Sequence, residues 1–355
     1  RSPGATVYQS PEFCSAWYEC YAPDWVPVAV LRYSADGRLC GAWFLARHAA
    51  LGTLTHAGAH QAEYHTWLHE PGDELDFVAD AWRQITGTLG VRSLRLRYFP
   101  SAEDGARLAR LPALSARVEV REVPRPLMRL DADEVAASFA KKSNRSRFNR
   151  LARIGPVTFE RVHGAEGFES VIGDLEACYD LRQDAANGVA PFRADPRKRA
   201  FHRRLMEAAG DETHVTVTRV GAQTVAGLWG QRSGDVLHLG LLFHSPLLAE
   251  HSPGKLHVMR LSEHLLREGF TTLDLTPGGD PWKERFANAH DVVAEIVLHA
   301  SPLSRLRTVW TGRLRRVARR VLSRVGITPE RVRKVAARLQ PDLVSTAWGR
   351  ARRWW

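Results

Sequence analysis

Two kinds of hydrophobic spacing alternate along residues 1–130. Residues 25–33 and 39–47 are apolar, with aromatic side chains in both runs and valines in the first, and Ser34-Ala35-Asp36-Gly37 between them is typical of a hairpin turn. Residues 74–89 instead carry hydrophobic side chains at helical spacing, followed by Gly90. The elements predicted for this mixed α/β unit, residues 1–130, are helices at 12–21 and 74–89 and strands at 25–33, 39–47, 91–98, 118–123 and 127–130.

The same alternation continues with longer elements over residues 131–300. Three apolar runs between residues 214 and 243 are separated by Gly221 and by a Ser-Gly-Asp turn, which predicts an antiparallel meander. A helix and a further strand follow the meander, which predicts a second α/β unit. Its predicted elements are helices at 133–153, 167–184, 196–209 and 255–268 and strands at 157–162, 214–220, 224–232, 236–243, 271–275 and 292–299.

The last segment, residues 301–355, combines a helical apolar stripe with all of the excess positive charge. The whole chain has a net charge of +11. Residues 301–355 contain fifteen basic and two acidic residues, whereas residues 1–300 contain 35 and 37. This pattern is typical of a helix at an anionic membrane surface, although it also suits packing on the body or a dimer. We expect peripheral attachment at the inner face of the membrane, so that deletion of 301–355 abolishes binding to anionic liposomes.

Composition narrows the class of protein. Of the 355 residues, 44% are hydrophobic and 25% charged, which excludes a collagen, a disordered chain and a polytopic membrane protein. The four cysteines show neither CxxC pairs nor metal-ligand spacing, which favours a reducing cytoplasm. We therefore expect a cytoplasmic α/β protein with a basic helical tail.

Three segments of the second unit carry a family pattern. They are Ser252-Pro253-Gly254-Lys255-Leu256, Leu273-Asp274-Leu275 and residues 279–286; residues 138–145 add a basic entry helix. Together they resemble the Acetyltransf_6 group of the GNAT superfamily, the CelD-like acetyltransferases of cellulose and exopolysaccharide biosynthesis. Residues 61–64 resemble the family's weaker N-terminal half. The Fem peptidyltransferases, which use aminoacyl-tRNA, are similar in layout. The resemblance implies tandem GNAT-like units, with catalysis in the second.

The resemblance also implies acyl-CoA as co-substrate and no metal. GNAT folds bind the CoA pyrophosphate where a loop enters a helix, since the helix N-terminus favours an anion. The matching residues here are Ser252, Gly254, Lys255 and Leu256. Gly254 lets the backbone approach closely and Lys255 adds a cation. The loop has one glycine where the superfamily has two, and the alternative is that Ser-Pro-Gly simply starts a helix.

Two residues are candidates for catalysis. Asp274 ends a strand beside that loop, and flanking by Leu273 and Leu275 is expected to raise its pKa, as suits a general base. Capping of the turn after it is the alternative role. Lys283 resembles the family's near-invariant lysine, which implies that it neutralises a phosphate or the developing charge; a solvated loop lysine is the alternative.

Other residues are candidates for substrate binding. Trp282 suits stacking on a sugar or adenine, or plugging the core. The resemblance places Arg182 and Asp184 toward the substrate, and Gln231 is expected to point into the cleft; His238 beside it is a weaker candidate, because a lone strand histidine is usually packed or exposed. The histidines at 56, 60, 65 and 69 lack a metalloprotease motif, so they predict a loop that lines the acceptor cleft rather than a metal site.

The basic helix at 133–153 predicts an anionic partner. Lys141 and Arg145 are the residues that we expect to contact it. A nucleotide sugar and a tRNA acceptor stem both fit, as does a solvated surface helix without a ligand. The sequence therefore predicts an acyltransferase that moves an acyl group from acyl-CoA to an amino or hydroxyl group of a glycan, glycolipid or small precursor. The alternatives are an aminoacyl-tRNA-dependent transferase and a non-catalytic scaffold at the membrane.

Overall fold

The structure is a computed structural model that describes residues 2, 4–72, 74–307 and 310. Residues 1–298 form one compact unit and residues 299–355 a second. The predicted division near residue 130 therefore falls inside the first unit. The predicted tail helix lies mostly outside the described residues. None of the helices in the described ranges is long and apolar enough to cross a membrane.

A small antiparallel sheet begins the first unit. Ser10 accepts a hydrogen bond from the backbone N–H of Phe13 and so caps α1, whose first residue is a proline. The predicted hairpin is confirmed, since β1 and β2 pair in antiparallel register. The elements of this part are η1 (Val7–Gln9), α1 (Pro11–Tyr21), β1 (Trp25–Tyr33), β2 (Leu39–His48), β3 (Leu54–His56), β4 (Leu68–His69), α2 (Glu74–Leu89) and α3 (Ala102–Leu108).

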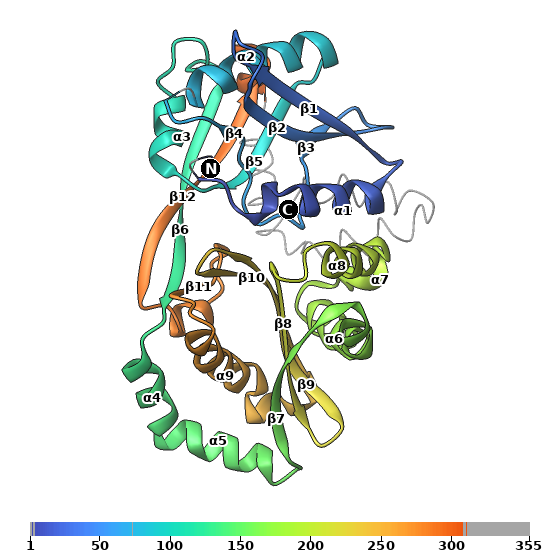
Figure 1. The fold of residues 1–355 in the computed structure, drawn as a ribbon, viewed down its shortest axis with the longest axis vertical. Helices are drawn as coiled ribbons and strands as arrows, with labels where there is room; N and C mark the ends of the chain where they lie inside the picture. Colours follow the sequence, from blue (N-terminus) through green and yellow to red (C-terminus); the bar gives the residue numbers. More distant parts are fainter. Residues whose placement is uncertain (1, 3, 73, 308–309, 311–355) are drawn as a thin grey trace, which may run out of the picture. The chain divides into compact units, whose positions relative to one another are not determined.

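An eight-stranded sheet joins the two predicted units (Figure 1). Its order is β5-β12-β6-β11-β10-β9-β8-β7, so the last strand lies between two strands that come from residues 1–130. The meander of β8, β9 and β10 is antiparallel as predicted. The strands are β5 (Ser93–Phe99), β6 (Val118–Arg129), β7 (Val157–Val162), β8 (Thr213–Val220), β9 (Gln223–Ser233), β10 (Val236–His244), β11 (Thr272–Asp274) and β12 (Ala289–His299).

Strand β6 is continuous where the sequence predicted two strands. Pro124 and Pro126 lie inside it and both pair with β12. The carbonyl of Pro126 accepts a hydrogen bond from Leu275 N–H, so this residue directs its backbone polar groups toward β11. Proline has no N–H to donate, and in Pro126 the nitrogen lies on the β11 side of the strand. Pro126 comes just outside the three residue pairs that join β11 to β6. No ladder hydrogen bond to β12 is lost, which is why prolines are tolerated.

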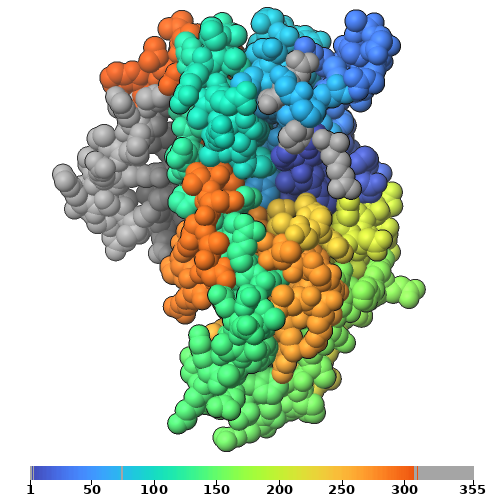
Figure 2. All heavy atoms as spheres, turned by 60° about the vertical axis from the view of Figure 1, so that its left-hand side comes forward, coloured from blue at the N-terminus to red at the C-terminus, as the bar shows by residue number. Residues whose placement is uncertain are grey.

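The predicted helix at 133–153 is two helices. Lys141 leaves the helical conformation between α4 (Ala132–Ala140) and α5 (Lys142–Ala152). In one continuous helix Phe139 and Phe148 would lie on opposite faces, because nine residues turn the chain by about 900°. The break lets both rings pack beside Leu256 on α9, and the Arg260 guanidinium lies over both. In Figure 2 the green surface of α4 and α5 lies against the orange surface of α9.

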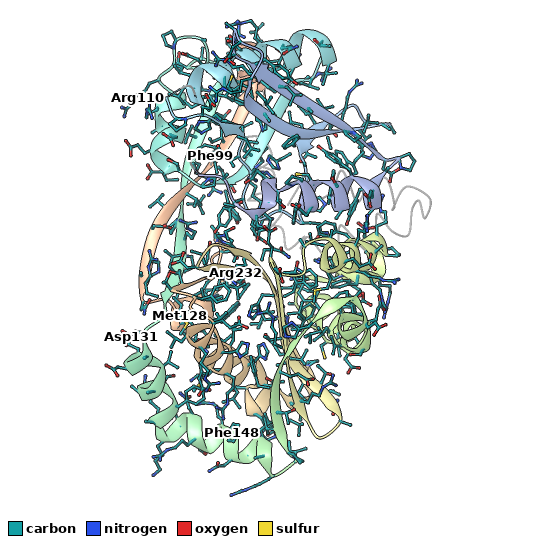
Figure 3. The ribbon with its side chains drawn as sticks, in the orientation of Figure 1. Phe99, Arg110, Met128, Asp131, Phe148 and Arg232 are labelled. Carbon is teal, nitrogen blue, oxygen red and sulfur yellow. The ribbon has the colours of Figure 1, made fainter. Side chains whose placement is uncertain are left out.

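The remaining helices cover the two faces of the large sheet. Leu237, Leu239, Leu273 and Leu275 pack under α9, while α6 and α8 share a core cluster with α1 on the other side. Figure 3 marks the end of β6 by Met128 and the start of α4 by Asp131. These elements are α6 (Gly164–Asn187), α7 (Pro191–Ala194), α8 (Arg197–Ala208), η2 (Pro246–His251), α9 (Pro253–Arg267) and η3 (Lys283–Arg285).

Candidate active site

A row of buried polar side chains crosses three neighbouring strands. Gln231 on β9 pairs with His238 on β10, which pairs with Asp274 on β11. Directly paired side chains lie on the same face of a sheet. The leucines on either side of His238 and Asp274 pack under α9, so the polar row faces the opposite way, toward the loops and helices of residues 1–130. All three polar residues are almost fully buried.

Asp274 is held by three hydrogen bonds. Its Oδ2 accepts from Tyr64 OH at 2.5 Å and from His238 Nδ1 at 2.9 Å, and its Oδ1 accepts from Thr276 N–H at 2.8 Å. The Arg125 guanidinium lies 3.6 Å away. Burial raises the pKa of this carboxyl, but the hydrogen bonds from His238 and Tyr64 and the charge of Arg125 outweigh it, so the pKa is lowered.

The lowered pKa corrects the expected chemistry of Asp274. Leu273 and Leu275, which were expected to raise it, turn away under α9. An ionised carboxylate accepts the Nδ1 proton of His238, and this fixes the tautomer that leaves Nε2 unprotonated in the neutral ring. Among the described residues, His238 Nε2 is buried without a hydrogen-bond partner. The group free to take a proton is therefore the histidine rather than the carboxylate.

Strands β10 and β11 separate immediately after this pair. Their parallel ladder ends at His238 and Asp274, while β10 continues to His244. On its other side β10 stays paired with β9, with a register shift between Leu239 and Leu241. The backbone of β10 beyond His238 therefore has a side that β11 does not cover. Such an open strand edge accepts an extended ligand through backbone hydrogen bonds.

A cavity of about 210 Å³ adjoins the polar row. Within residues 1–130 it is lined by the loop around Glu63 and by Arg97, and within residues 131–300 by α6, α8, β9 and β10. Gln231 of the row lines it directly, and so does Tyr8, whose ring lies 5.9 Å from that of His238. The expectation that the loop carrying Glu63 faces a cleft thus agrees with its position.

Several buried polar atoms around the cavity have no hydrogen-bond partner in the described part of the chain. They are the hydroxyl of Tyr8, both amide atoms of Gln231 and both ring nitrogens of His202. Leaving such a buried atom unpaired costs about 1–3 kcal/mol. Both donors and acceptors occur in this set, and burial keeps the pKa of His202 well below its usual value. The arrangement suits a polar ligand.

Lys283 is buried and supports the loop that follows Asp274. Its ammonium donates to the carbonyls of Thr276 and Pro277 at 2.9 and 3.2 Å and to the Thr276 hydroxyl at 3.2 Å. Burial lowers its pKa, while the nearby carboxylate of Asp280 opposes that shift. Thr276 has a φ of 59°, a backbone conformation that costs energy and is often retained at functional sites. The lysine stabilises this strained turn.

The N-terminus of α9 carries the residues predicted to bind a phosphate. Ser252 precedes the helix in the left-handed conformation, and Gly254 is so close to the ring of His244 that a Cβ would lie 3.1 Å from it. Leu256 points into the core cluster with Met259 rather than outward. Of the four residues predicted to bind a phosphate, Lys255 is the one with a charged side chain at the start of α9.

A cluster of positive side chains surrounds Lys255. Burial lowers its pKa, and the charges of Arg147, Lys141 and Arg285 lower it further. These groups come from α5, from the residue before it and from η3, so the fold gathers cations from separate segments at one helix N-terminus. Arg145 lies on the exposed surface of α5. The arrangement attracts a polyanion.

The other predicted substrate residues lie elsewhere. Arg182 has its guanidinium 5.4 Å from the ring of Tyr179, which lines the cavity. Asp184 lines a separate groove between α6 and α7. Trp282 packs against Phe286 in the core cluster under α9, which fits the alternative role of a hydrophobic plug.

The histidine group near residue 60 lies in a loop. His56 and His65 stack with ring centroids 4.6 Å apart and bind backbone carbonyls. Among the described residues, the donor atoms close enough to share a metal ion belong to His214, His264 and Glu268, on another part of the fold. Arg161 already binds both oxygens of Glu268.

Sequence reasoning missed Tyr8, Tyr64 and Arg125. Each lies within residues 1–130, far from Asp274 along the chain. Nothing in the local pattern marks Tyr8 or Arg125 as part of a site, and Tyr64 was given no role although it ends the segment 61–64 that resembles the family. His238 had a usable signal, since its pairing with Gln231 follows from the meander and its polarity breaks an otherwise apolar strand.

One protein family matches part of the chain. Residues 138–284 match the Acetyltransf_6 family, described as an acetyltransferase (GNAT) domain. This segment contains α9, β11 and the start of η3, and thus both Asp274 and Lys283. No curated protein matches the chain. The CelD-like exopolysaccharide context therefore stays a prediction.

Solved structures resemble most of the chain. The C-terminal domain (DUF2156) of a protein assigned as a lysylphosphatidylglycerol synthetase from Agrobacterium fabrum is 14% identical, with a TM-score of 0.52, covering 86% of this chain and 92% of that one. FemX is 10% identical with a TM-score of 0.55, covering 86% and 95%. L-PGS from Bacillus licheniformis is 11% identical with a TM-score of 0.52, covering 86% and 97%. At these identities the likeness shows the fold alone: a mixed α/β structure with GNAT-like sheets.

Proposed function

We propose that this protein, a mixed α/β chain with a GNAT domain, transfers an acyl group from acyl-CoA to an amino or hydroxyl group of a small acceptor in the cavity. One observation carries the proposal. Asp274 holds His238 by Nδ1 and so leaves Nε2 unpartnered. Gln231, which pairs with His238, and Tyr8, whose ring lies 5.9 Å from that of His238, both line a cavity with unsatisfied polar atoms. A fixed, unpartnered ring nitrogen is suited to accept a proton during acyl transfer.

The proposed reaction uses two groups of the protein. His238 Nε2 takes the proton of the acceptor, whose nitrogen or oxygen then forms a bond to the thioester carbonyl carbon. The carbon–sulfur bond breaks with its electron pair on sulfur, and the thiolate takes up a proton as it leaves. The hydroxyl of Tyr8 is suited to stabilise the oxyanion, since burial raises its pKa well above the usual value and keeps its proton in place.

The donor would lie along the open side of β10. Its acyl end then reaches His238, and its phosphates reach the positive cluster of Lys255, Lys141, Arg147 and Arg285 at the N-terminus of α9. In this proposal Lys283 is a positioning residue, because its hydrogen bonds go to the loop and leave little capacity for a ligand.

Aminoacyl-tRNA is a second candidate donor. The observation that favours it is the exposed basic surface of α5, which continues beyond Lys255 through Arg145 and Arg150. This is more positive charge than the three phosphate groups of CoA require, and it suits a nucleic-acid backbone.

Calorimetric titration distinguishes the donors. With acetyl-CoA we expect binding in the micromolar range that weakens about tenfold in Lys255→Ala, since a charged phosphate contact contributes about 1–2 kcal/mol. Arg153→Ala, an exposed change after the end of α5, is the matched control and should bind acetyl-CoA as the wild type does. Absence of acetyl-CoA binding in folded protein, together with tRNA binding that falls steeply with salt, would overturn CoA as donor.

A further inference from the structure

Three charged side chains line the acceptor cavity. They are the carboxylate of Glu63, the guanidinium of Arg97 and the ammonium of Lys198. The two cations come from different elements, β5 and α8, and Glu63 comes from the loop between β3 and β4. Burial raises the pKa of Glu63, and the charges of Arg97, Lys283 and Lys198 reduce this rise without cancelling it, so these groups lie close enough to act on one another.

Beside the polar side chains of Tyr8, Gln231 and His202, the rest of the wall has an apolar part. Phe13, Tyr179, Phe201, Trp229 and Leu241 contribute to it. Lys198 connects the charged and apolar parts, since its ammonium lies 5.3 Å from the centre of the Tyr179 ring. A ligand that matches this wall needs a positive group, a negative group and a compact apolar part.

The size of the cavity limits that ligand. A dry cavity of about 150 Å³ holds benzene. A volume of about 210 Å³ therefore suits a branched aliphatic side chain with its backbone atoms, and it is small for a disaccharide or a nucleotide.

We propose that the acceptor is a small zwitterion with a primary amine, a neighbouring carboxylate and a short apolar side chain, as in a free aliphatic α-amino acid. The carboxylate pairs with Arg97 and Lys198, and Glu63 holds the ammonium. Glu63 is thus a binding residue, and its charge aligns the nitrogen toward His238. This inference names the acceptor of the proposed acyl transfer. Its chemical step rests on the proposed function, whereas the binding of the zwitterion does not.

The reaction on this acceptor balances as an N-acylation. The ammonium loses one proton to solvent and a second, as the C–N bond forms, to His238 Nε2. The carbon–sulfur bond of the thioester breaks, and the sulfur leaves as thiol after taking up a proton. The products are an N-acyl amino acid and the free thiol, without oxidation or reduction.

Three related probes test the charge pattern by calorimetry on the full chain. L-Leucine carries both charges, 3-methylbutylamine lacks the carboxylate, and 4-methylpentanoate lacks the amine. We expect L-leucine to bind at least about tenfold more tightly than either analogue, because each loses one charge-assisted contact. Equal affinity for L-leucine and 3-methylbutylamine, or no binding of any probe, would overturn the proposal.

Two variants assign the contacts. Glu63→Gln should lower the affinity for L-leucine about tenfold and leave the affinity for 4-methylpentanoate unchanged. Arg97→Met should lower the affinity for L-leucine and leave the affinity for 3-methylbutylamine unchanged. Arg92→Met, a change on an exposed residue before β5, is the control and should bind like the wild type. Circular dichroism establishes that each variant is folded; the opposite pattern of losses would contradict the assignment.

The two proposals fail in different ways. If L-leucine binds with the expected pattern while no thioester is consumed, the proposal of acyl transfer is wrong and the proposal of a zwitterion site is supported. If thioester is consumed with another amine or alcohol while L-leucine does not bind, the proposal of a zwitterion site is wrong and the proposal of acyl transfer is supported.

Discussion

Asp274→Asn should destabilise the protein by about 3 kcal/mol at pH 7 and lower acyl transfer by about 10²–10⁴-fold. The amide cannot accept from Tyr64, His238 and Thr276 as the carboxylate does, and it frees the His238 ring from its fixed tautomer. His238→Ala should lose a similar amount of activity, because it removes the ring nitrogen that is proposed to accept the proton. Chemical denaturation and thioester consumption measure the two effects separately.

The pH dependence of this difference follows from the lowered pKa of Asp274. A group that is more acidic in the folded state stabilises the fold fully above its ordinary pKa of about 3.9, and this contribution is lost as the pH falls through the folded value. The gap in unfolding free energy between wild type and Asp274→Asn should therefore be constant from pH 7 to about 5 and shrink below about pH 4. A gap that grew on acidification would mean that the carboxyl is protonated in the fold.

Lys283→Met should have the second largest effect, about 2–3 kcal/mol of unfolding free energy. Methionine fills the space of the stem, but the carbonyls of Thr276 and Pro277 lose their donor in a buried position. Activity should fall as well, since the turn from Thr276 holds Asp274 through a backbone hydrogen bond.

Lys142→Met is the matched control for Lys283→Met. This lysine is exposed on α5, and its replacement should change the unfolding free energy by less than about 0.5 kcal/mol. Thermal and urea unfolding of both variants provide the comparison. A stable Lys283→Met that loses donor affinity alone would instead show that the ammonium contacts the donor.

Local pattern predicted much of residues 131–300. Alternation in β10 and β11 places Leu237 and Leu273 on one face and His238 and Asp274 on the other, and the α9 helix follows from its spacing and its Ser-Pro-Gly start. These features depend on residues close in sequence, which is why a single chain suffices to predict them.

The parts that were missed depend on contacts across the chain. The position of β12 between β5 and β6 cannot be read from any local period, and neither can the hydrogen bond from Tyr64 to Asp274, which spans 210 positions. The helix break at Lys141 follows from packing of Phe139 and Phe148 on α9, which overrides helical propensity. The sign of the Asp274 pKa shift was missed for the same reason, because its donors come from other elements.

The rate of thioester consumption tests the central claim most directly. Wild type, His238→Ala and Lys142→Met would be mixed with acetyl-CoA, with and without L-leucine, and the released thiol followed with a chromogenic reagent. We expect thiol release in the wild type and in Lys142→Met, and a rate at least about 10²-fold lower in folded His238→Ala. Equal rates in His238→Ala and the wild type would contradict the assignment of His238 as the group that accepts the proton.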